Sequence, residues 1–246
     1  MLKHLRNKKV QKRIYLGLAI AIIPPFALWG VFMGRGEKSS FLGTIENSKI
    51  SVKQYLDSYK AVQHQAMFLY GPQFESIKSI INFKGEAWDR LLLLDYAKKE
   101  KIRASDQEVV DWLAGQPVFA RHGYFDMDFY KRYVTSALRT STRDFEEEIR
   151  QILVISKIRE RLRSQIHFTD EELKNIYEKA HQPFDEKKFS EEKESFRQTM
   201  TDEKIAKEMR ALLEKLRGSL KVDLETMKQI FGAEEKEVKA TEPQVS

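Results

Sequence analysis

The sequence predicts a mainly α-helical protein, with one N-terminal membrane-spanning helix followed by a helical domain that contains a small β-sheet. Three observations support this fold class. An uncharged run of twenty residues lies near the N-terminus, most other apolar residues recur at helical spacing, and strand-like patterns are confined to short segments near the two ends of the domain.

The predicted membrane span is Ile14 to Met33, which carries no charged residue. A helix of that length rises about 30 Å, which matches the hydrocarbon core of a bilayer. The arm before it, residues 1–13, holds six Lys and Arg residues and no acid, so the positive-inside rule places it in the cytoplasm. We therefore expect a single-pass protein of the bacterial inner membrane whose main domain is periplasmic.

A cleavable signal peptide is the main alternative for this stretch. The apolar run exceeds the usual 7–15 residues of such a peptide, and no A-x-A-like cleavage site follows it. A buried core helix is the other alternative, but an uncharged run of this length is rare in soluble domains. The pattern favours an uncleaved anchor.

The net charge of +6 comes entirely from the basic arm. Six of the 43 basic residues lie there, so the rest of the chain holds 37 basic and 37 acidic residues and is neutral. This balance argues against nucleic acid as a partner and makes anionic membrane lipid a partner of the arm. The absence of cysteine excludes disulfides, a cysteine-ligated zinc and a thiol nucleophile.

The domain is expected to open with two short strands within residues 39–51, around the turn-like cluster Glu46-Asn47-Ser48. Ser51 can then cap a helix whose apolar residues include Tyr55 and Val62, and which stops by Gly71-Pro72. A short helix is expected over residues 74–83. Gly85 is expected to separate it from a stronger helix over residues 86–101.

Two capping boxes, at residues 105–108 and 169–172, predict helices that end near Gly115 and Ala180. Between them, the pattern predicts a loop over 117–126, a helix over 127–138, and a long helix over 143–165 capped by Ser141 or Thr142. After the break at Pro183, a charged helix is expected over 189–217, followed by a strand over 220–224 and a disordered charged tail over 233–246.

Catalytic and metal-binding motifs are not found in the sequence. It contains no G-x-G-x-x-G, P-loop, G-x-S-x-G or H-E-x-x-H motif, and its five histidines lack ligand spacing. We therefore expect no catalytic residue, no metal site and no cofactor.

Four segments occur in a characteristic order: GTIENSKIS, AWDRLLLLDYAKKEKIRASDQEVVDWL, PVFARHGYFDMDFYKRYV and STRDFEEEIRQILVISKI. Together with the basic arm and the span, they closely resemble the membrane-anchored periplasmic foldases of the PpiD type, which share the SurA N-terminal chaperone domain. The resemblance covers residues 1–180 and resumes over 189–224. It implies a SurA-like helical chaperone domain over residues 39–232, closed by the C-terminal helix and strand.

The resemblance also implies how the ends of the domain meet. Phe41–Ile45 and Leu220–Leu224 are expected to share a sheet, because each is too short to be stable alone. The apolar Ile205–Leu216 face is expected to cover the Tyr55–Val62 helix.

The family usually carries a parvulin prolyl-isomerase domain after the helix that corresponds to Asp170–Ala180. Such a domain needs on the order of a hundred residues. Only residues 181–188 lie between the two predicted helices, so we expect the chaperone half of the family without isomerase chemistry.

The candidate client-binding residues are aromatic or apolar and lie beside Gly71-Pro72 and on the central loop. They are Met67, Phe68, Tyr70, Phe74, Val118, Phe119, Tyr124 and Phe125. Met and aromatic side chains suit varied partners because they adapt their contacts, although each one taken singly is more often an ordinary core residue.

The expected function is to bind unfolded or newly exported polypeptides at the membrane, with the translocon as a further candidate partner. The alternatives are a peptidyl-prolyl cis-trans isomerase of the parvulin class and a membrane-tethered adaptor for one dedicated partner.

Overall fold

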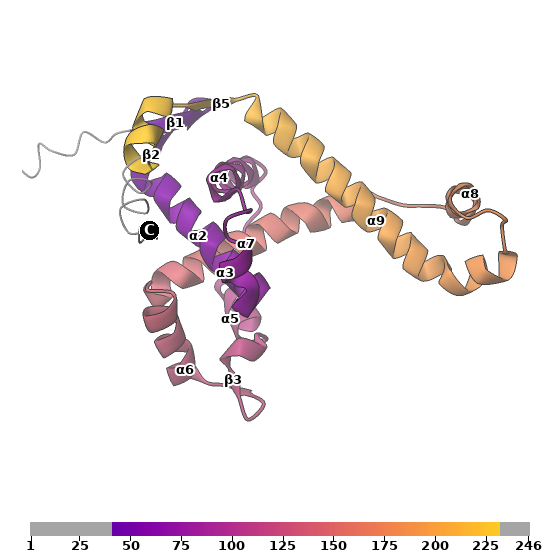
Figure 1. Cartoon of the computed structure of the whole chain (residues 1–246), viewed down its shortest axis with the longest axis horizontal. Coiled ribbons are helices and arrows are strands. Elements are labelled where there is room, and N and C mark those ends of the chain that lie inside the picture. The colour runs from indigo at the N-terminus through magenta and orange to yellow at the C-terminus, as the bar shows by residue number, and fades with distance from the viewer. Residues whose placement is uncertain (1–40, 232–246) are drawn as a thin grey trace, which may run out of the picture. The chain divides into compact units, whose positions relative to one another are not determined.

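The computed structural model describes residues 41–231 (Figure 1). The chain divides into a unit that ends at Phe41 and a unit that begins at Leu42, and the elements below belong to the second apart from Phe41 itself. The expected span Ile14–Met33 and the expected tail over 233–246 lie outside the described residues. Within residues 41–231, no helix has both the length and the apolar character needed to cross a membrane.

The described part is mainly helical, as the sequence predicts. In chain order its elements are β1 (Phe41–Ile45), β2 (Ser48–Ser51), α2 (Val52–Tyr70), η2 (Gly71–Gln73), α3 (Phe74–Ile77), α4 (Phe83–Lys99), α5 (Asp106–Ala114), η3 (Pro117–Phe119), β3 (Ala120–Arg121), β4 (Tyr124–Phe125), α6 (Met127–Arg132), η4 (Tyr133–Ala137), α7 (Thr142–Arg163), α8 (Asp170–Ala180), α9 (Glu186–Arg217) and β5 (Leu220–Val222). A further helix covers residues 224–231.

Side-chain caps fix where most of these helices begin. Ser51, Ser105 and Thr169 each close a capping box, in which the cap side chain accepts from the backbone three residues later and the reverse bond is also made. Ser141 caps α7 in the simpler way, accepting from the backbone of Asp144 at 3.0 Å. These four predictions are confirmed, because capping depends on local sequence alone.

The region between α2 and α4 differs from the prediction. α3 spans only Phe74–Ile77, and α4 already begins at Phe83, so Gly85 lies in the first turn of α4 and does not separate two helices. The side chain of Asn82 caps α4 by accepting from the Gly85 amide at 3.0 Å. A Cβ at Gly85 would lie 2.5 Å from Asn82 Nδ2. The glycine therefore makes room for the cap.

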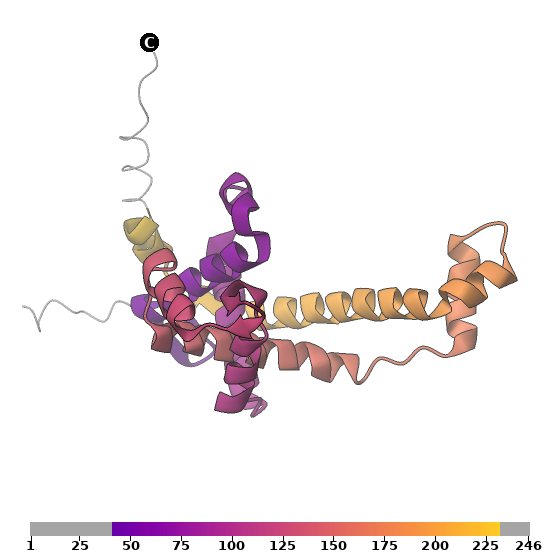
Figure 2. The same ribbon diagram turned by 90° about the horizontal axis from the view of Figure 1, so that it is seen from below.

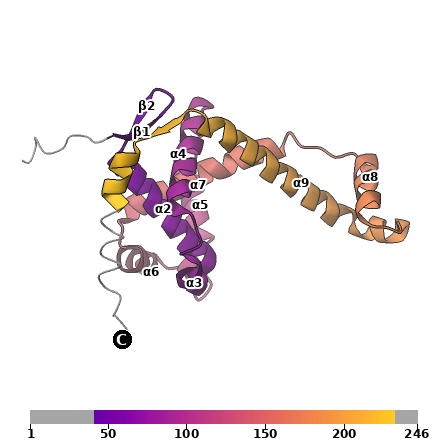
Figure 3. The same cartoon turned by 45° about the horizontal axis from the view of Figure 1, so that its top comes forward.

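The two ends of the domain meet in one three-stranded sheet of order β2-β1-β5. β5 pairs antiparallel with β1, with Gly43 opposite Val222 and Ile45 opposite Leu220. Figure 3 shows β5 leading from the end of α9 back to β1. The predicted pairing is thus confirmed, although β5 stops at Val222 instead of continuing to Leu224.

The helix over residues 224–231 was not predicted. Asp223 caps it by accepting from the backbone of Glu225 and Thr226, each at 3.1 Å. The helix carries Phe231 into the core cluster beneath the sheet, where its ring lies 6.0 Å from that of Tyr55 and 5.3 Å from that of Tyr59.

The apolar face of α9 covers α4 and α7, not the Tyr55–Val62 stretch of α2 as expected. Ile205 and Met209 are buried against Leu93 of α4 and Ile158 of α7. α2 instead packs mainly along α4, which occupies the apolar face that α9 was expected to cover. Leu216, at the end of α9, packs against the cluster that contains Tyr55.

The N-terminal half of α9 carries α8 at the end far from the sheet, as Figures 1 and 2 both show. A small aromatic core joins the two helices, with Leu173 and Tyr177 of α8 buried against Phe189 of α9. α9 begins at Glu186, three residues before the predicted Phe189, because Asp185 caps it by accepting from the Lys187 amide at 2.9 Å.

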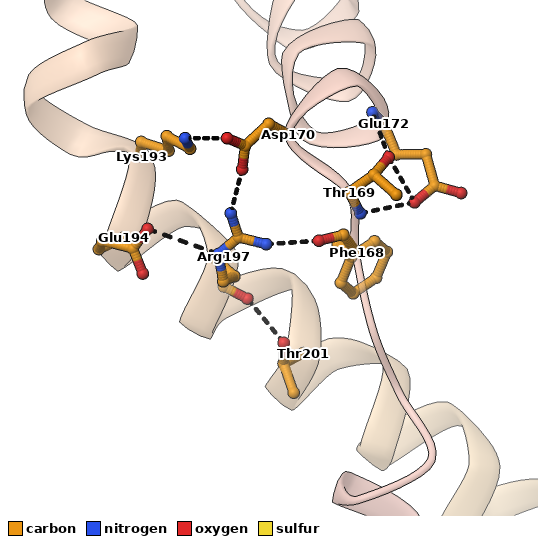
Figure 4. Close-up of polar contacts among 8 residues, drawn as sticks. All are labelled: Phe168, Thr169, Asp170, Glu172, Lys193, Glu194, Arg197 and Thr201. Carbon is orange, nitrogen blue, oxygen red and sulfur yellow. Dashed lines mark hydrogen bonds and ion pairs between the residues drawn. The ribbon is translucent and has the colours of Figure 1, made fainter.

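A polar clamp also fastens α8 to α9 (Figure 4). Asp170, at the start of α8, forms ion pairs with Lys193 and, at 2.5 Å, with Arg197 of α9. Arg197 also donates to the Phe168 carbonyl oxygen at 2.5 Å. These two basic side chains hold the pKa of Asp170 below its usual range, Lys193 being the larger cause.

Candidate functional site

An apolar pocket of about 270 Å³ lies between α2, α5 and α7. Its apolar lining comes from Ala61, Phe68, Leu69, Trp112, Phe145, Ile149 and Ile152. The ring of Phe68 stacks on that of Phe145 with centroids 5.6 Å apart and meets Trp112 edge-on at 6.4 Å. Leu69 stands at the rim with 71% of its surface exposed. These residues form what we call the apolar pocket.

Ion pairs hold α5 against α7 and so position the Trp112 wall. Arg150 of α7 pairs with Asp106 at 2.6 Å and donates to the Ala104 carbonyl oxygen at 3.0 Å. Lys157 of α7 pairs with Glu108 of α5 at 2.6 Å. The Lys157 ammonium, together with hydrogen bonds from Ser105, lowers the pKa of Glu108 to about 2.

A buried histidine ties α2 to α7 at the polar edge of the pocket. His64 Nδ1 lies 2.8 Å from Glu148 Oε2, and its Nε2 lies 3.1 Å from the Leu138 carbonyl oxygen. Both ring nitrogens are therefore engaged, one by a carboxyl group and one by a backbone carbonyl oxygen. The interaction fixes the ring as part of the wall.

The structure divides the sequence-predicted residues between core and surface. Phe119 is fully buried, with its ring packed against Phe68, Tyr130 and Phe145, so its assignment to the client surface is corrected. Met67, Phe68 and Phe125 are partly buried and pack against the same core cluster. Phe68 is the one of these that lines the apolar pocket.

The remaining predicted residues are more accessible. Tyr70 and Val118 are exposed, Tyr124 is 81% exposed, and Phe74 is half-buried against Phe83 with ring centroids 6.2 Å apart. None of these four lines the apolar pocket. The predicted surface is therefore not one continuous patch around the pocket.

Tyr124 belongs to a β-hairpin with two-residue strands, within the segment 117–126 that the sequence predicts to be a loop. β3 and β4 pair Ala120 with Phe125 across a turn at His122-Gly123. Both turn residues have positive φ, 53° and 83°, as a tight hairpin turn of this type requires. The His-Gly pair is the sequence signal for it.

Sequence reasoning missed Leu69, Trp112 and Ile152 of the pocket. Leu69 follows the core-facing Phe68 directly, so it lies off the buried face of α2, where an apolar residue has no structural reason to be. That displacement was the available signal. Trp112 and Ile152 lie on amphipathic helices, where a pocket-lining residue looks like any other core residue.

The pocket suits one bulky apolar side chain. Its volume lies just below the range of about 300–1,000 Å³ typical of small-molecule sites, and its aromatic rings offer edge-to-face contacts. The residue types at its edge, two Gln amides with the engaged His64–Glu148 pair, offer hydrogen bonds but no nucleophile. Among the described residues, no group of three or more side chains is arranged to hold a metal ion.

Comparison with known protein families gives one match. The model of the SurA-like N-terminal domain matches residues 1–159, which is more than half of the chain. No curated protein and no solved structure matches the chain.

Proposed function

Because this chain belongs to the SurA-like N-terminal domain family, we propose that it is a membrane-anchored periplasmic chaperone that holds unfolded or newly exported polypeptides. Membership suggests the periplasmic chaperone type of function. The observation that carries the proposal is the apolar pocket with the 71% exposed Leu69 at its rim. An exposed leucine beside an aromatic cavity is a surface that an unfolded chain can cover.

Binding at this pocket is weak and reversible. Burying one large apolar side chain is worth roughly 1.5–3 kcal/mol, part of which is offset by ordering the client. One such contact gives rapid exchange, which suits a protein that must release its clients without nucleotide. Further exposed apolar side chains, such as Tyr124, supply additional weak contacts.

The proposed location follows from the sequence. The uncharged Ile14–Met33 run anchors the chain, and the basic arm keeps residues 1–13 in the cytoplasm beside anionic lipid. The domain is thereby held near the site where exported chains emerge, which makes the translocon a candidate partner.

We further propose that the protein has no prolyl-isomerase activity. α8 ends at Ala180 and α9 begins at Glu186, and the two helices pack directly on one another. Catalysis of prolyl isomerisation needs a preorganised pocket whose polar groups favour the twisted amide. Residues 181–185 are too few to hold such a domain.

An aggregation assay tests the proposal. Full-length protein in lipid nanodiscs should slow the light-scattering rise of a chemically unfolded substrate at near-stoichiometric ratio. Leu69→Ser should weaken the effect, whereas Ile80→Ser, which removes an 81% exposed apolar residue outside the pocket, should change it less. In the same sample, the time constant of prolyl-peptide isomerisation should stay at its uncatalysed value of tens of seconds or longer.

Failure takes distinct forms in this assay. A parent protein that leaves aggregation unchanged contradicts chaperone function. Binding to a single folded protein with no effect on unfolded substrates would indicate an adaptor instead. Clear isomerase turnover would refute the absence of that activity.

A further inference from the structure

A second and larger cavity lies next to the apolar pocket. It is a groove of about 750 Å³ bordered by α2, α4, α7 and α9. Its apolar lining includes Leu93, Ile155, Ile205 and Met209, and its remaining lining is largely charged. We call it the arginine groove, because four of its lining residues are Arg90, Arg159, Arg163 and Arg210.

Arg90 is buried in this groove without a carboxylate partner. Its Nη2 donates to the Glu148 carbonyl oxygen at 3.1 Å and to Gln151 Oε1 at 3.0 Å, both uncharged acceptors. Its Nε has no hydrogen-bond partner within residues 41–231. Burial lowers the pKa of Arg90 to about 10, and the nearby charges of Glu148 and Glu147 oppose only part of this effect.

Arg159 of α7 and Arg210 of α9 are exposed at the same groove, and neither forms an ion pair within 4.0 Å in the part of the chain that the structure describes. Two carboxylates of the same lining are already engaged. Asp202 pairs with Arg163 at 2.6 Å, and Asp89 pairs with Arg217.

Two acidic side chains of the lining remain. They are Glu86 and Glu160, and neither forms an ion pair within 4.0 Å among the described residues. The lining thus presents three arginines without an ion-pair partner, Arg90, Arg159 and Arg210, beside these two carboxylates. Among the unpaired side chains of the groove, arginines therefore outnumber carboxylates by three to two above the apolar floor.

The groove and the apolar pocket adjoin. Gln65 of α2 lines both cavities, and on α7 Ile152 of the pocket lies three residues from Ile155 of the groove. Residues three apart on a helix are neighbours on its surface. One extended polypeptide can therefore cross Gln65 and reach both cavities.

We propose that the arginine groove binds an acidic residue of the same polypeptide whose bulky apolar side chain occupies the apolar pocket. The preferred clients are thus extended segments that carry a carboxylate close to a large apolar residue. This inference rests on the proposed chaperone function and adds a chemical preference to it. The unpaired arginines favour a carboxylate in the groove. Because the two cavities adjoin, one chain can place the carboxylate in the groove and a bulky apolar side chain in the apolar pocket.

The test compares three fluorescent peptides that share one apolar core and differ only in flanking residues, which are Glu, Gln or Lys. Binding to full-length protein in zwitterionic nanodiscs is followed by fluorescence anisotropy at low and high salt. The Glu peptide should bind about fivefold more tightly than the Gln peptide, the size expected for two partly exposed charge pairs. The Lys peptide should bind most weakly, and salt should reduce the differences.

Variants locate the effect. Arg159→Gln/Arg210→Gln should remove the preference for Glu while leaving the affinity for the Gln peptide unchanged, and both positions are exposed, so the fold should be kept. The matched control is Arg103→Gln/Arg143→Gln, which removes two exposed arginines outside both cavities and should retain the preference.

Equal affinities for the Glu and Gln peptides would overturn the inference and leave the chaperone proposal standing. The same loss of preference in the control variant would attribute it to overall charge and also overturn it. Displacement of the Glu peptide by phosphatidylglycerol vesicles, from the parent but not from the Arg159→Gln/Arg210→Gln variant, would assign the groove to lipid headgroups instead. Failure of all three peptides to bind would contradict the proposed function as well.

Discussion

Phe231 offers a direct test of whether the C-terminal helix belongs to the core of the domain. The side chain is 4% exposed, contacts the rings of Tyr55 and Tyr59, and lies under Lys84 Nζ at 4.5 Å from its ring centre. Truncating a buried Phe to Ala costs about 3–5 kcal/mol. Because residues 224–231 form a terminal helix that can relax into the space, we expect the lower value, about 3 kcal/mol.

For a domain of this size, each kcal/mol shifts the melting temperature by about 2–4 °C, so Phe231→Ala should lower it by about 6–12 °C. Circular dichroism at 222 nm on the full-length protein measures the shift. Leu224→Ala is the matched control, because Leu224 is exposed in the same helix and its loss should cost under about 0.5 kcal/mol. Equal melting temperatures for Phe231→Ala and the parent would show that the helix is not part of the cooperative core.

Two further predictions concern the sheet and the α5–α7 contact. Gly43→Ala should destabilise the domain by about 2 kcal/mol or more in urea unfolding, because its Cβ would lie 2.4 Å from the Lys221 carbonyl oxygen. Gly115→Ala is the control and should be neutral, because no atom beyond its two chain neighbours would lie nearer than 3.4 Å to its Cβ. A neutral Gly43→Ala would refute the β1–β5 register. The pKa of Glu108 is lowered from 4.5 to about 2, chiefly by Lys157, so its stabilising contribution is present above pH 4.5 and is lost as the pH falls toward 2. Glu108→Gln should therefore reduce the difference in urea midpoint between pH 6 and pH 3, and an unchanged difference would contradict the ion pair.

The elements that depend on local sequence could be predicted. Capping residues such as Ser51 and Thr169 act within one turn, so they mark helix starts without reference to the rest of the chain. Gly85 was misread because its role depends on Asn82 as a cap, a side-chain contact that the glycine's identity alone does not reveal. The helix over 224–231 was not predicted, because it is short and a charged segment follows it directly in the sequence. Asp223, a standard capping residue, was the available signal for its start.

The site was less predictable, because it depends on contacts between distant segments. Phe119 follows a proline on a connecting segment, which suggested exposure, yet packing by Phe145 and Tyr130 from later helices buries it completely. The arginine groove exists only because α9 returns past α4 and α7, so Arg90 and Arg210, far apart in sequence, line one cavity. No periodicity within one helix predicts such a meeting.

Site-specific photo-crosslinking tests the central claim, that the apolar pocket holds unfolded polypeptide. Benzoylphenylalanine is placed at Leu69, on the rim of the pocket, and separately at Ile80, which is 81% exposed outside it. The full-length protein is irradiated with the same substrate in its unfolded and native forms. We expect strong crosslinks from position 69 to the unfolded form, weak ones from position 80, and none from either position to the native form. Equal crosslinking from both positions, or crosslinks from position 69 to the native form, would contradict the claim.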